Sequence, residues 1–120
     1  MAKILIVDDD ALGAQIYLNQ LTALGHEVTL ATDGEMAMAK LNQRHDLILL
    51  DIMVPRIGGV ELLSYIKKSV NAATAVLVYT NLISEETKEK CMMLGAKEYL
   101  LKADLTPSQL VDKISSYLSA

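Results

Sequence analysis

The chain has 120 residues, of which 52% are hydrophobic and 22% charged, and a net charge of -4. This length and balance fit one domain with a real core, over residues 1–120, and exclude a disordered chain. The 15 acidic and 11 basic residues include no Lys or Arg cluster, so direct nucleic-acid binding is not expected. No apolar run approaches the roughly 18 residues that span a bilayer. No signal-peptide pattern follows Met1, so we expect a cytoplasmic protein with no membrane partner.

Five short runs of Ile, Leu and Val alternate with segments of helical periodicity along the chain. Such runs, without polar interruption, are typical of strands that are buried on both faces of a parallel sheet. We expect strands at residues 3–7, 28–31, 46–51, 75–79 and 97–101. We expect helices at residues 11–24, 60–68, 84–94 and 107–119, and one that opens at 33–35 and continues through 41.

The helices are indicated by apolar residues at helical spacing. In the first helix these residues are Leu12, Ile16, Leu21 and Leu24, with Tyr17 between them. In the second helix, the residues that can face the sheet are Met36, Met38 and Leu41, the methionines as core filler. In the third helix the inward residues are Leu62, Leu63 and Ile66. In the last helix one face carries Leu110, Val111, Ile114 and Leu118.

The alternation of strands and helices predicts the topology. Strands joined through helices at this spacing imply right-handed crossovers and a doubly wound sheet with helices on both faces. We therefore expect an α/β, flavodoxin-like (βα)5 fold with strand order 2-1-3-4-5. In such a sheet the ligand crevice lies where the order reverses, between the first and third strands.

Polar side chains gather at the predicted carboxyl ends of the strands. The first strand ends on Asp8 and Asp9, the third on Asp51, the fourth on Thr80 and the fifth on Lys102. Three crowded carboxylates repel one another unless a cation neutralises them, and oxygen ligands favour a hard ion, Mg²⁺ or Mn²⁺. Asp51 ends the middle strand alone and is the best nucleophile, since carboxylates accept phosphoryl groups as aspartyl-phosphates. Thr80 and Lys102 would then bind phosphoryl oxygens.

Four motifs follow one another in the chain: residues 4–10, residues 46–55 with Gly58-Gly59, the strand end at Thr80, and residues 95–102. In these motifs, and over residues 3 to 119, the chain resembles the receiver domains of two-component response regulators, including those of chemotaxis. The resemblance implies a phosphorylation-controlled interaction module. Its partners would be a sensor histidine kinase or a histidine phosphotransfer protein, and a downstream effector. It would be a monomer or a phosphorylation-dependent homodimer.

The resemblance also implies roles for the acidic residues. Asp51 would be the residue that is phosphorylated. Asp8 and Asp9 would bind Mg²⁺ together with Asp51 and the backbone carbonyl of Met53.

The remaining site residues would serve the phosphoryl group and the switch. By the resemblance, Lys102 would contact the phosphoryl group, Thr80 would be the switch hydroxyl, and Tyr99 would be the aromatic side chain that changes rotamer with it. These changes would shift the face formed by the fourth helix with the fifth strand and helix.

The chain departs from the family pattern beside the site. Ala103 follows Lys102, where the family usually has Pro joined by a cis bond, so we expect either a trans bond with an altered loop or a strained exception. Asn81 is larger than the residue that often follows the switch Thr, and could restrict the site or add a hydrogen bond. Two residues beyond the acceptor and the switch hydroxyl stand Met53 and Leu82, neither of which can orient an attacking water. We therefore expect the domain to hydrolyse its aspartyl-phosphate slowly.

An alternative on the same fold is a phosphatase that acts on small phosphate esters through an aspartyl intermediate. Against it, the loop after Asp51 has no Asp-x-Asp pair, and no long insertion builds a substrate pocket. A flavin carrier is weaker still, because aromatics make up only 4% and no phosphate-binding loop follows the first strand. Asp10 is expected only to start a helix and Cys91 only to pack, and His26 and His45 are expected at the opposite end of the sheet from the acids.

Overall fold

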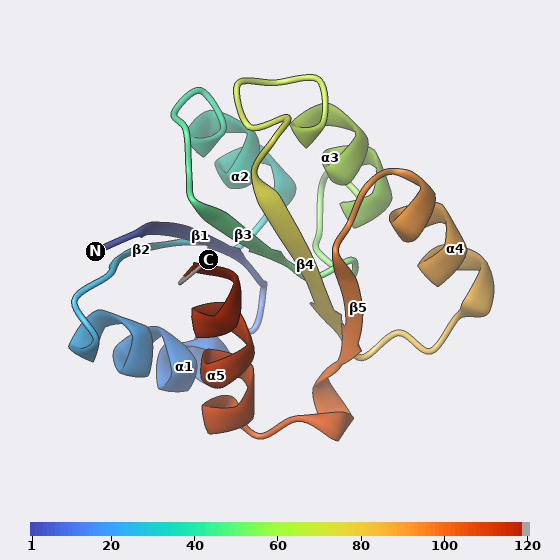
Figure 1. The fold of residues 1–120 in the computed structure, drawn as a ribbon. Helices are drawn as coiled ribbons and strands as arrows, with labels where there is room; N and C mark the ends of the chain where they lie inside the picture. The colour runs from blue at the N-terminus through green and yellow to red at the C-terminus, as the bar shows by residue number, and fades with distance from the viewer. Residues whose placement is uncertain (119–120) are drawn as a thin grey trace.

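The computed structural model describes residues 1–118. A parallel sheet runs through the middle of the molecule in the order β2-β1-β3-β4-β5 (Figure 1). Its strands are β1 (Lys3–Val7), β2 (Glu27–Ala31), β3 (Leu47–Leu50), β4 (Ala75–Thr80) and β5 (Glu98–Leu101). The helices are α1 (Ala11–Ala23), α2 (Gly34–Lys40), α3 (Gly59–Ile66), α4 (Glu85–Met93) and α5 (Pro107–Leu118). The predicted fold class and strand order are confirmed.

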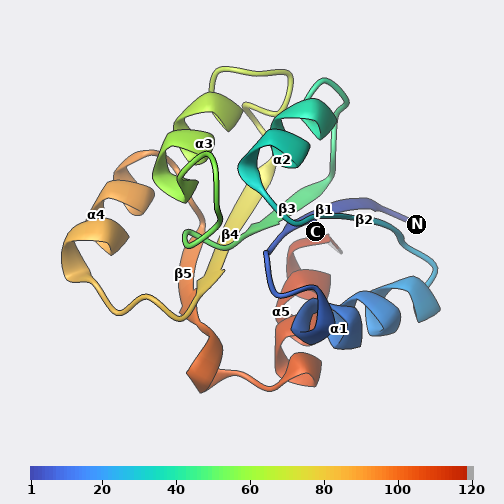
Figure 2. The ribbon, with the colours of Figure 1, turned by 180° about the vertical axis from the view of Figure 1, so that it is seen from behind.

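The helices form two layers, one on each face of the sheet. Figures 1 and 2 show α1 and α5 together on one face, and α2, α3 and α4 on the other. Successive residues of a strand point to opposite faces. Leu5 and Val7 of β1 therefore join the core beneath α2 to α4, while Ile4 and Ile6 join the core beneath α1 and α5. Both faces of the strand are covered, which explains why its sequence is apolar without alternation.

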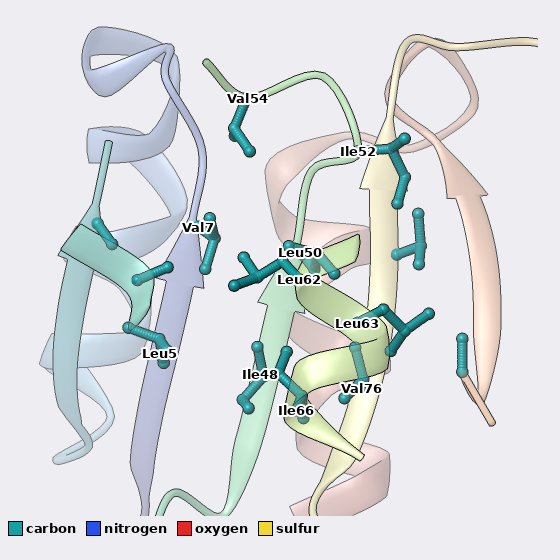
Figure 3. Close-up of a cluster of buried hydrophobic side chains, with 14 of the residues drawn as sticks. Leu5, Val7, Ile48, Leu50, Ile52, Val54, Leu62, Leu63, Ile66 and Val76 are labelled. Carbon is teal, nitrogen blue, oxygen red and sulfur yellow. The ribbon is translucent and has the colours of Figure 1, made fainter. Parts of the chain in front are cut away.

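The core beneath α3 shows how the sheet is covered on one face. Figure 3 shows Leu62, Leu63 and Ile66 of α3 beside the side chains of Ile48 and Val76 in the sheet. All five residues are fully buried. Burial of each such side chain typically contributes about 1.5–3 kcal/mol to stability. The predicted inward face of α3 is confirmed.

Helix ends are set by caps and glycines. The hydroxyl of Ser84 accepts the N–H of Thr87 at the start of α4. Gly25 and Gly95 follow α1 and α4 with φ of 92° and 100°, a left-handed conformation that glycine adopts without strain. Observed ends lie within two residues of the predicted ones, and the predicted end of α5 at residue 119 lies outside the described residues. None of the described helices has the length and apolar character needed to cross a membrane.

The buried face of α1 differs from the apolar spacing that predicts the helix. Three residues of that spacing are more than half exposed: Leu12, Ile16 and Leu24. The buried face consists of Ala14, Tyr17 and Leu21, which are also three and four residues apart. The helix takes this rotation because the small Ala14 allows close packing and the hydroxyl of Tyr17 finds a partner on the inner side.

The prediction for α2 is wrong at Met36, which is 40% exposed. Its sulfur accepts a hydrogen bond from the hydroxyl of Thr32 at 3.2 Å. Ala37 and Leu41, which are four residues apart, are buried, and Met38 packs partly against the core. Leu41 directly follows the seven-residue helix, and these residues cover the sheet without Met36, which is left toward solvent.

Candidate functional site

The carboxylates of Asp8 and Asp51 lie together because the strands that precede them are neighbours. β1 and β3 are paired in parallel with Val7 opposite Leu50, and the N–H of Asp51 donates to the carbonyl of Val7 at 2.9 Å. Both carboxylates therefore stand at the carboxyl edge of the sheet, where the strand order reverses. Asp8 and Asp51 are only 3% and 5% exposed, whereas Asp9 is exposed.

Asp8, Asp9 and Asp51 form a cluster that can hold a metal ion. Each offers one carboxylate oxygen, and these oxygens lie within 4.8 Å of one another. Oxygen ligands of this kind suit a hard divalent cation. The structure thus brings together the three carboxylates that the strand ends predict.

The ammonium group of Lys102 lies between the two buried carboxylates. Its Nζ is 2.8 Å from Oδ2 of Asp8 and 2.9 Å from Oδ2 of Asp51. Burial alone lowers the pKa of Lys102, but its hydrogen bonds with Asp8 and Asp51 and their charges outweigh burial and raise the pKa above its usual value. Lys102 is therefore a fixed positive charge at neutral pH.

The chain after Lys102 takes the first of the two predicted courses. The bond to Ala103 is trans, as are all peptide bonds within residues 1–118. A short 3₁₀ helix, η1 (Lys102–Asp104), then turns the chain toward α5. Lys102 reaches both carboxylates from this loop.

Backbone N–H groups hold the second oxygen of each carboxylate. The N–H of Asp10 donates to Oδ1 of Asp8 at 3.0 Å, and the N–H of Met53 donates to Oδ1 of Asp51 at 2.9 Å. Each donor lies two residues after its acceptor, as in an Asx turn. These bonds fix both side chains so that each Oδ2 faces Lys102. Met53 thus contacts the site through its N–H, and its carbonyl as a metal ligand stays a prediction.

Tyr17 of α1 is a site residue that the sequence analysis did not single out. Its hydroxyl donates to Oδ2 of Asp8 at 2.9 Å, and its ring packs edge-on against Tyr79, with 5.9 Å between centroids and 85° between planes. The Nζ of Lys102 lies 5.8 Å from the ring centroid of Tyr79. Burial, and then the charge of Asp8, raises the pKa of Tyr17, so its hydroxyl stays a donor. The signal in the sequence was a tyrosine within an apolar helix, since a buried phenol needs a partner.

Thr80 and Tyr99 are both tied to one residue of the β4–α4 loop. Thr80 ends β4 and is fully buried, and its hydroxyl accepts the N–H of Leu82 at 3.3 Å. The hydroxyl of Tyr99 donates to the carbonyl of Leu82 at 2.7 Å. Burial raises the pKa of Tyr99, which keeps this donor protonated. The structure therefore links the predicted switch residues, and their change of rotamer stays a prediction. Asn81, which lies between Thr80 and Leu82 in the chain, is exposed.

The loop between β3 and α3 is tied to the start of α2. The N–H of Gly34 donates to the carbonyl of Pro55 at 3.1 Å. The guanidinium of Arg56 lies 3.5 Å from Asp33 and 3.8 Å from Glu35. Arg56 has φ of 76°, the one positive value at a non-glycine residue within residues 1–118, and this conformation costs an L-residue about 1–2 kcal/mol. These contacts hold the loop that follows β3 and Asp51.

Asp10, Cys91, His26 and His45, which were not expected to take part in the chemistry of the site, lie where the sequence predicts. The carboxylate of Asp10 accepts the N–H of Gly13 at 3.0 Å and caps α1. Cys91 is fully buried, and burial raises the pKa of its thiol. His26 and His45 precede β2 and β3 at the amino edge of the sheet, and each ring makes a hydrogen bond there.

Comparisons with known proteins identify the family. A sequence profile of the response regulator receiver domain matches residues 4–115, so the chain belongs to this family. The transcriptional regulatory protein CpxR of Klebsiella pneumoniae is 36% identical over 118 residues, which cover 98% of this chain and 50% of that protein. The uncharacterized transcriptional regulatory protein YrkP of Bacillus subtilis is 36% identical over 100 residues, which cover 83% and 42%. The chain thus spans half or less of the length of these two relatives.

Solved structures of response regulator receiver proteins have the same fold as this chain. The CheY-like receiver domain protein from Methanospirillum hungatei has a TM-score of 0.91 and 30% identity, and the match covers 99% of this chain and 94% of that one. The chemotaxis protein CheY4 of Vibrio cholerae has a TM-score of 0.86 and 32% identity, over 98% of each chain. The resemblance found in the sequence motifs is confirmed.

Proposed function

We propose that this chain is a phosphorylation-controlled switch of a two-component system, with Asp51 as the phospho-acceptor. The observation that carries the proposal is the ammonium of Lys102, which lies 2.8 Å from the carboxylate of Asp8 and 2.9 Å from that of Asp51 at the carboxyl edge of the sheet. A cation fixed beside a nucleophilic carboxylate balances the charge that a phosphoryl group brings.

The acidic cluster fits the divalent ion that such a transfer uses. Asp8, Asp9 and Asp51 supply oxygens within 4.8 Å of one another, and together with the carbonyl of Met53 they would hold Mg²⁺, or Mn²⁺ instead. When bound, the ion offsets repulsion between these carboxylates and the phosphoryl oxygens. Asp9 is the exposed member of this cluster.

Asp51 is prepared for the transfer by its hydrogen bonds. Its Oδ1 is held by the N–H of Met53, so Oδ2, which faces Lys102, is the oxygen that attacks phosphorus. The O–P bond forms as the P–N bond of a phosphohistidine breaks, and the electron pair stays on the imidazole nitrogen. Lys102 then turns from Asp8 and Asp51 to a phosphoryl oxygen, whose negative charge keeps the ammonium group charged.

Thr80 and Tyr99 would carry the change to the surface. The hydroxyl of Thr80, now an acceptor for Leu82, would turn to donate to a phosphoryl oxygen. Leu82 also holds the hydroxyl of Tyr99, so a shift of this loop would free Tyr99 to change rotamer. The face of α4, β5 and α5 would then have two states, and the phosphoryl group would select between them.

The partners follow from this chemistry. Residues 1–120 would act as one receiver domain in the cytoplasm, with a sensor histidine kinase or a histidine phosphotransfer protein as donor and a downstream effector as target. The domain would be a monomer, or a homodimer that forms on phosphorylation. Met53 and Leu82 offer no acid or amide to orient water, so the phosphoryl group would be lost slowly, over more than minutes.

The test is intact mass after incubation with acetyl phosphate and Mg²⁺. Wild type should gain one phosphoryl group and Asp51→Asn should gain none, and a chelator should abolish the gain. Asp46→Asn is the matched control, because Asp46 precedes the same strand at its other end and accepts the N–H of Lys3 at 2.7 Å. A gain in Asp51→Asn, or none in wild type, would contradict the proposal.

A further inference from the structure

Tyr17 makes a contact to the acidic cluster that the proposed reaction does not yet use. Its side chain is on the inner face of α1 and the residue is 4% exposed. The hydroxyl donates to Oδ2 of Asp8 at 2.9 Å, the same oxygen that the ammonium of Lys102 approaches to 2.8 Å. Oδ1 of Asp8 accepts the N–H of Asp10. Asp8 thus has three donors, of which two are neutral and one is charged.

Lys102, the charged donor, cannot serve Asp8 and the phosphoryl group at the same time. In the structure Lys102 neutralises Asp8 and Asp51. In the proposed reaction Lys102 would turn to the phosphoryl group, and these carboxylates would then be balanced by the divalent ion that they hold. The flexible stem of Lys102 allows this move, but the move removes a donor from Oδ2 of Asp8.

The hydroxyl of Tyr17 cannot leave in the same way. Its ring is packed edge-on against Tyr79 and belongs to the core between the sheet and α1, together with Leu21 and Ile6. A buried ring held on several sides keeps its rotamer, and the hydroxyl keeps its direction.

We propose that Tyr17 is a positioning residue of the metal site, which holds Asp8 toward the cation independently of Lys102. The inference rests on the proposed function. Hydrogen bonds to metal-ligating carboxylates fix ligand orientation, and their loss typically lowers metal affinity about 10–100-fold. Phe in place of Tyr17 removes one oxygen atom and keeps the ring, so the packing of α1 is retained.

The experiment measures Mn²⁺ binding to the full chain by the electron paramagnetic resonance signal of free Mn²⁺, with no phosphodonor present. We expect Tyr17→Phe to raise the dissociation constant about tenfold. Tyr79→Phe is the matched control, because it removes a hydroxyl from the neighbouring ring, and Asp8 takes its hydrogen bonds from Asp10, Tyr17 and Lys102 within residues 1–118. Its dissociation constant should stay within about twofold of wild type.

A double-mutant cycle shows whether the effect passes through Asp8. In an Asp8→Asn background, Tyr17→Phe should change Mn²⁺ binding by less than about twofold. Three outcomes would overturn the inference and leave the metal site in place. Tyr17→Phe could weaken Mn²⁺ binding equally with and without Asp8, it could weaken Mn²⁺ binding no more than Tyr79→Phe does, or it could leave Mn²⁺ binding unchanged. Wild type that binds no Mn²⁺ would overturn the proposed metal site, and this inference with it.

Discussion

The two edges of the sheet both bury polar groups but satisfy them with different partners. At the carboxyl edge, the carboxylates of Asp8 and Asp51 each pair with the ammonium of Lys102, at 2.8 Å and 2.9 Å. At the amino edge, the fully buried Asn71 bonds mainly to backbone: its Oδ1 accepts the N–H of His45 at 2.8 Å and the hydroxyl of Thr74 at 3.1 Å, and its amide donates to two carbonyls of the α2–β3 connection. A side-chain partner can be exchanged for the atoms of a ligand, whereas a backbone partner cannot be exchanged without opening the loop.

The difference assigns separate tasks to the two edges. Under the proposed function, the charges at the carboxyl edge would change partners when a cation or a phosphoryl group binds. The amide contacts at the amino edge connect the loop before β3 to the loop before β4, and we expect them to serve stability. Substitutions at the two edges should therefore affect different measurements.

The largest effect is expected from Lys102→Met, which removes the charge and keeps most of the length of the side chain. Asp8 and Asp51 then remain buried without a cation, and breaking a buried ion pair from one side typically costs about 3–5 kcal/mol. We expect the free energy of unfolding to fall by about 3 kcal/mol without metal, and Mg²⁺ to restore part of it. Urea unfolding with and without Mg²⁺ measures both effects.

A surface lysine provides the control. Lys90 pairs with Glu86 at 3.3 Å, and both side chains are more than half exposed, so Lys90→Met should change stability by less than about 1 kcal/mol, with no dependence on Mg²⁺. Equal stability of wild type and Lys102→Met in the absence of metal would mean that Lys102 does not neutralise the carboxylates in solution.

The next effect is expected from Asn71→Ala at the amino edge. The substitution leaves the N–H of His45 and two backbone carbonyls without partners, and an orphaned buried group costs about 1–3 kcal/mol. We expect a loss of about 2 kcal/mol in urea unfolding, while phosphorylation by acetyl phosphate proceeds as in wild type. Asn42→Ala, at an exposed position of the same connection, should change stability by less than about 0.5 kcal/mol. A folded Asn71→Ala protein that cannot be phosphorylated would contradict the assignment of separate tasks to the two edges of the sheet.

The sequence predicts the carboxyl edge better than the amino edge for a physical reason. Apolar runs locate the strands, the topology sends all carboxyl ends to one edge, and the residues after each run must then meet. This logic is enough to bring Asp8, Asp51 and Lys102 together. The role of Asn71 could not be obtained in this way, because the backbone groups that it bonds to lie 26 to 30 residues away in the chain, and no local pattern indicates them.

The rotation of α1 could not be predicted for a related reason. Leu12 and Ile16 are the more apolar choice for a buried face, but they are exposed, and Tyr17 is buried instead. What decides the rotation is the carboxylate of Asp8, which comes from the neighbouring strand and offers Tyr17 a hydrogen bond. Helical periodicity predicts that a helix exists, and contacts from other elements decide which side is buried.

The smallest effect is expected from Tyr117→Phe at the amino edge, where the carboxylate of Glu98 has side-chain partners. Glu98 begins β5 and accepts hydrogen bonds from the hydroxyl of Tyr117 and from Lys113, both on α5. Burial alone would raise the pKa of Glu98, but these hydrogen bonds outweigh it and hold the pKa below its usual value, while the pKa of Tyr117 is raised to about 12. Loss of the hydroxyl should lower stability by about 1 kcal/mol at neutral pH.

The pH dependence of the stability lost in Tyr117→Phe shows whether the charge of Glu98 stabilises the fold. A carboxylate with a lowered pKa in the folded state contributes stability above its unfolded pKa, and the contribution disappears as the pH falls through the folded value. The difference between wild type and Tyr117→Phe should therefore be full at pH 7 and shrink as urea unfolding is repeated at increasingly acid pH. Tyr65→Phe is the control, since Tyr65 is 43% exposed, and its small effect should not vary with pH. A Tyr117→Phe deficit that persists in acid would mean that the hydroxyl stabilises α5 by packing rather than through Glu98. Phosphorylation of Asp51 should be unchanged in either case, because Glu98 lies at the amino edge of the sheet and Asp51 at the carboxyl edge.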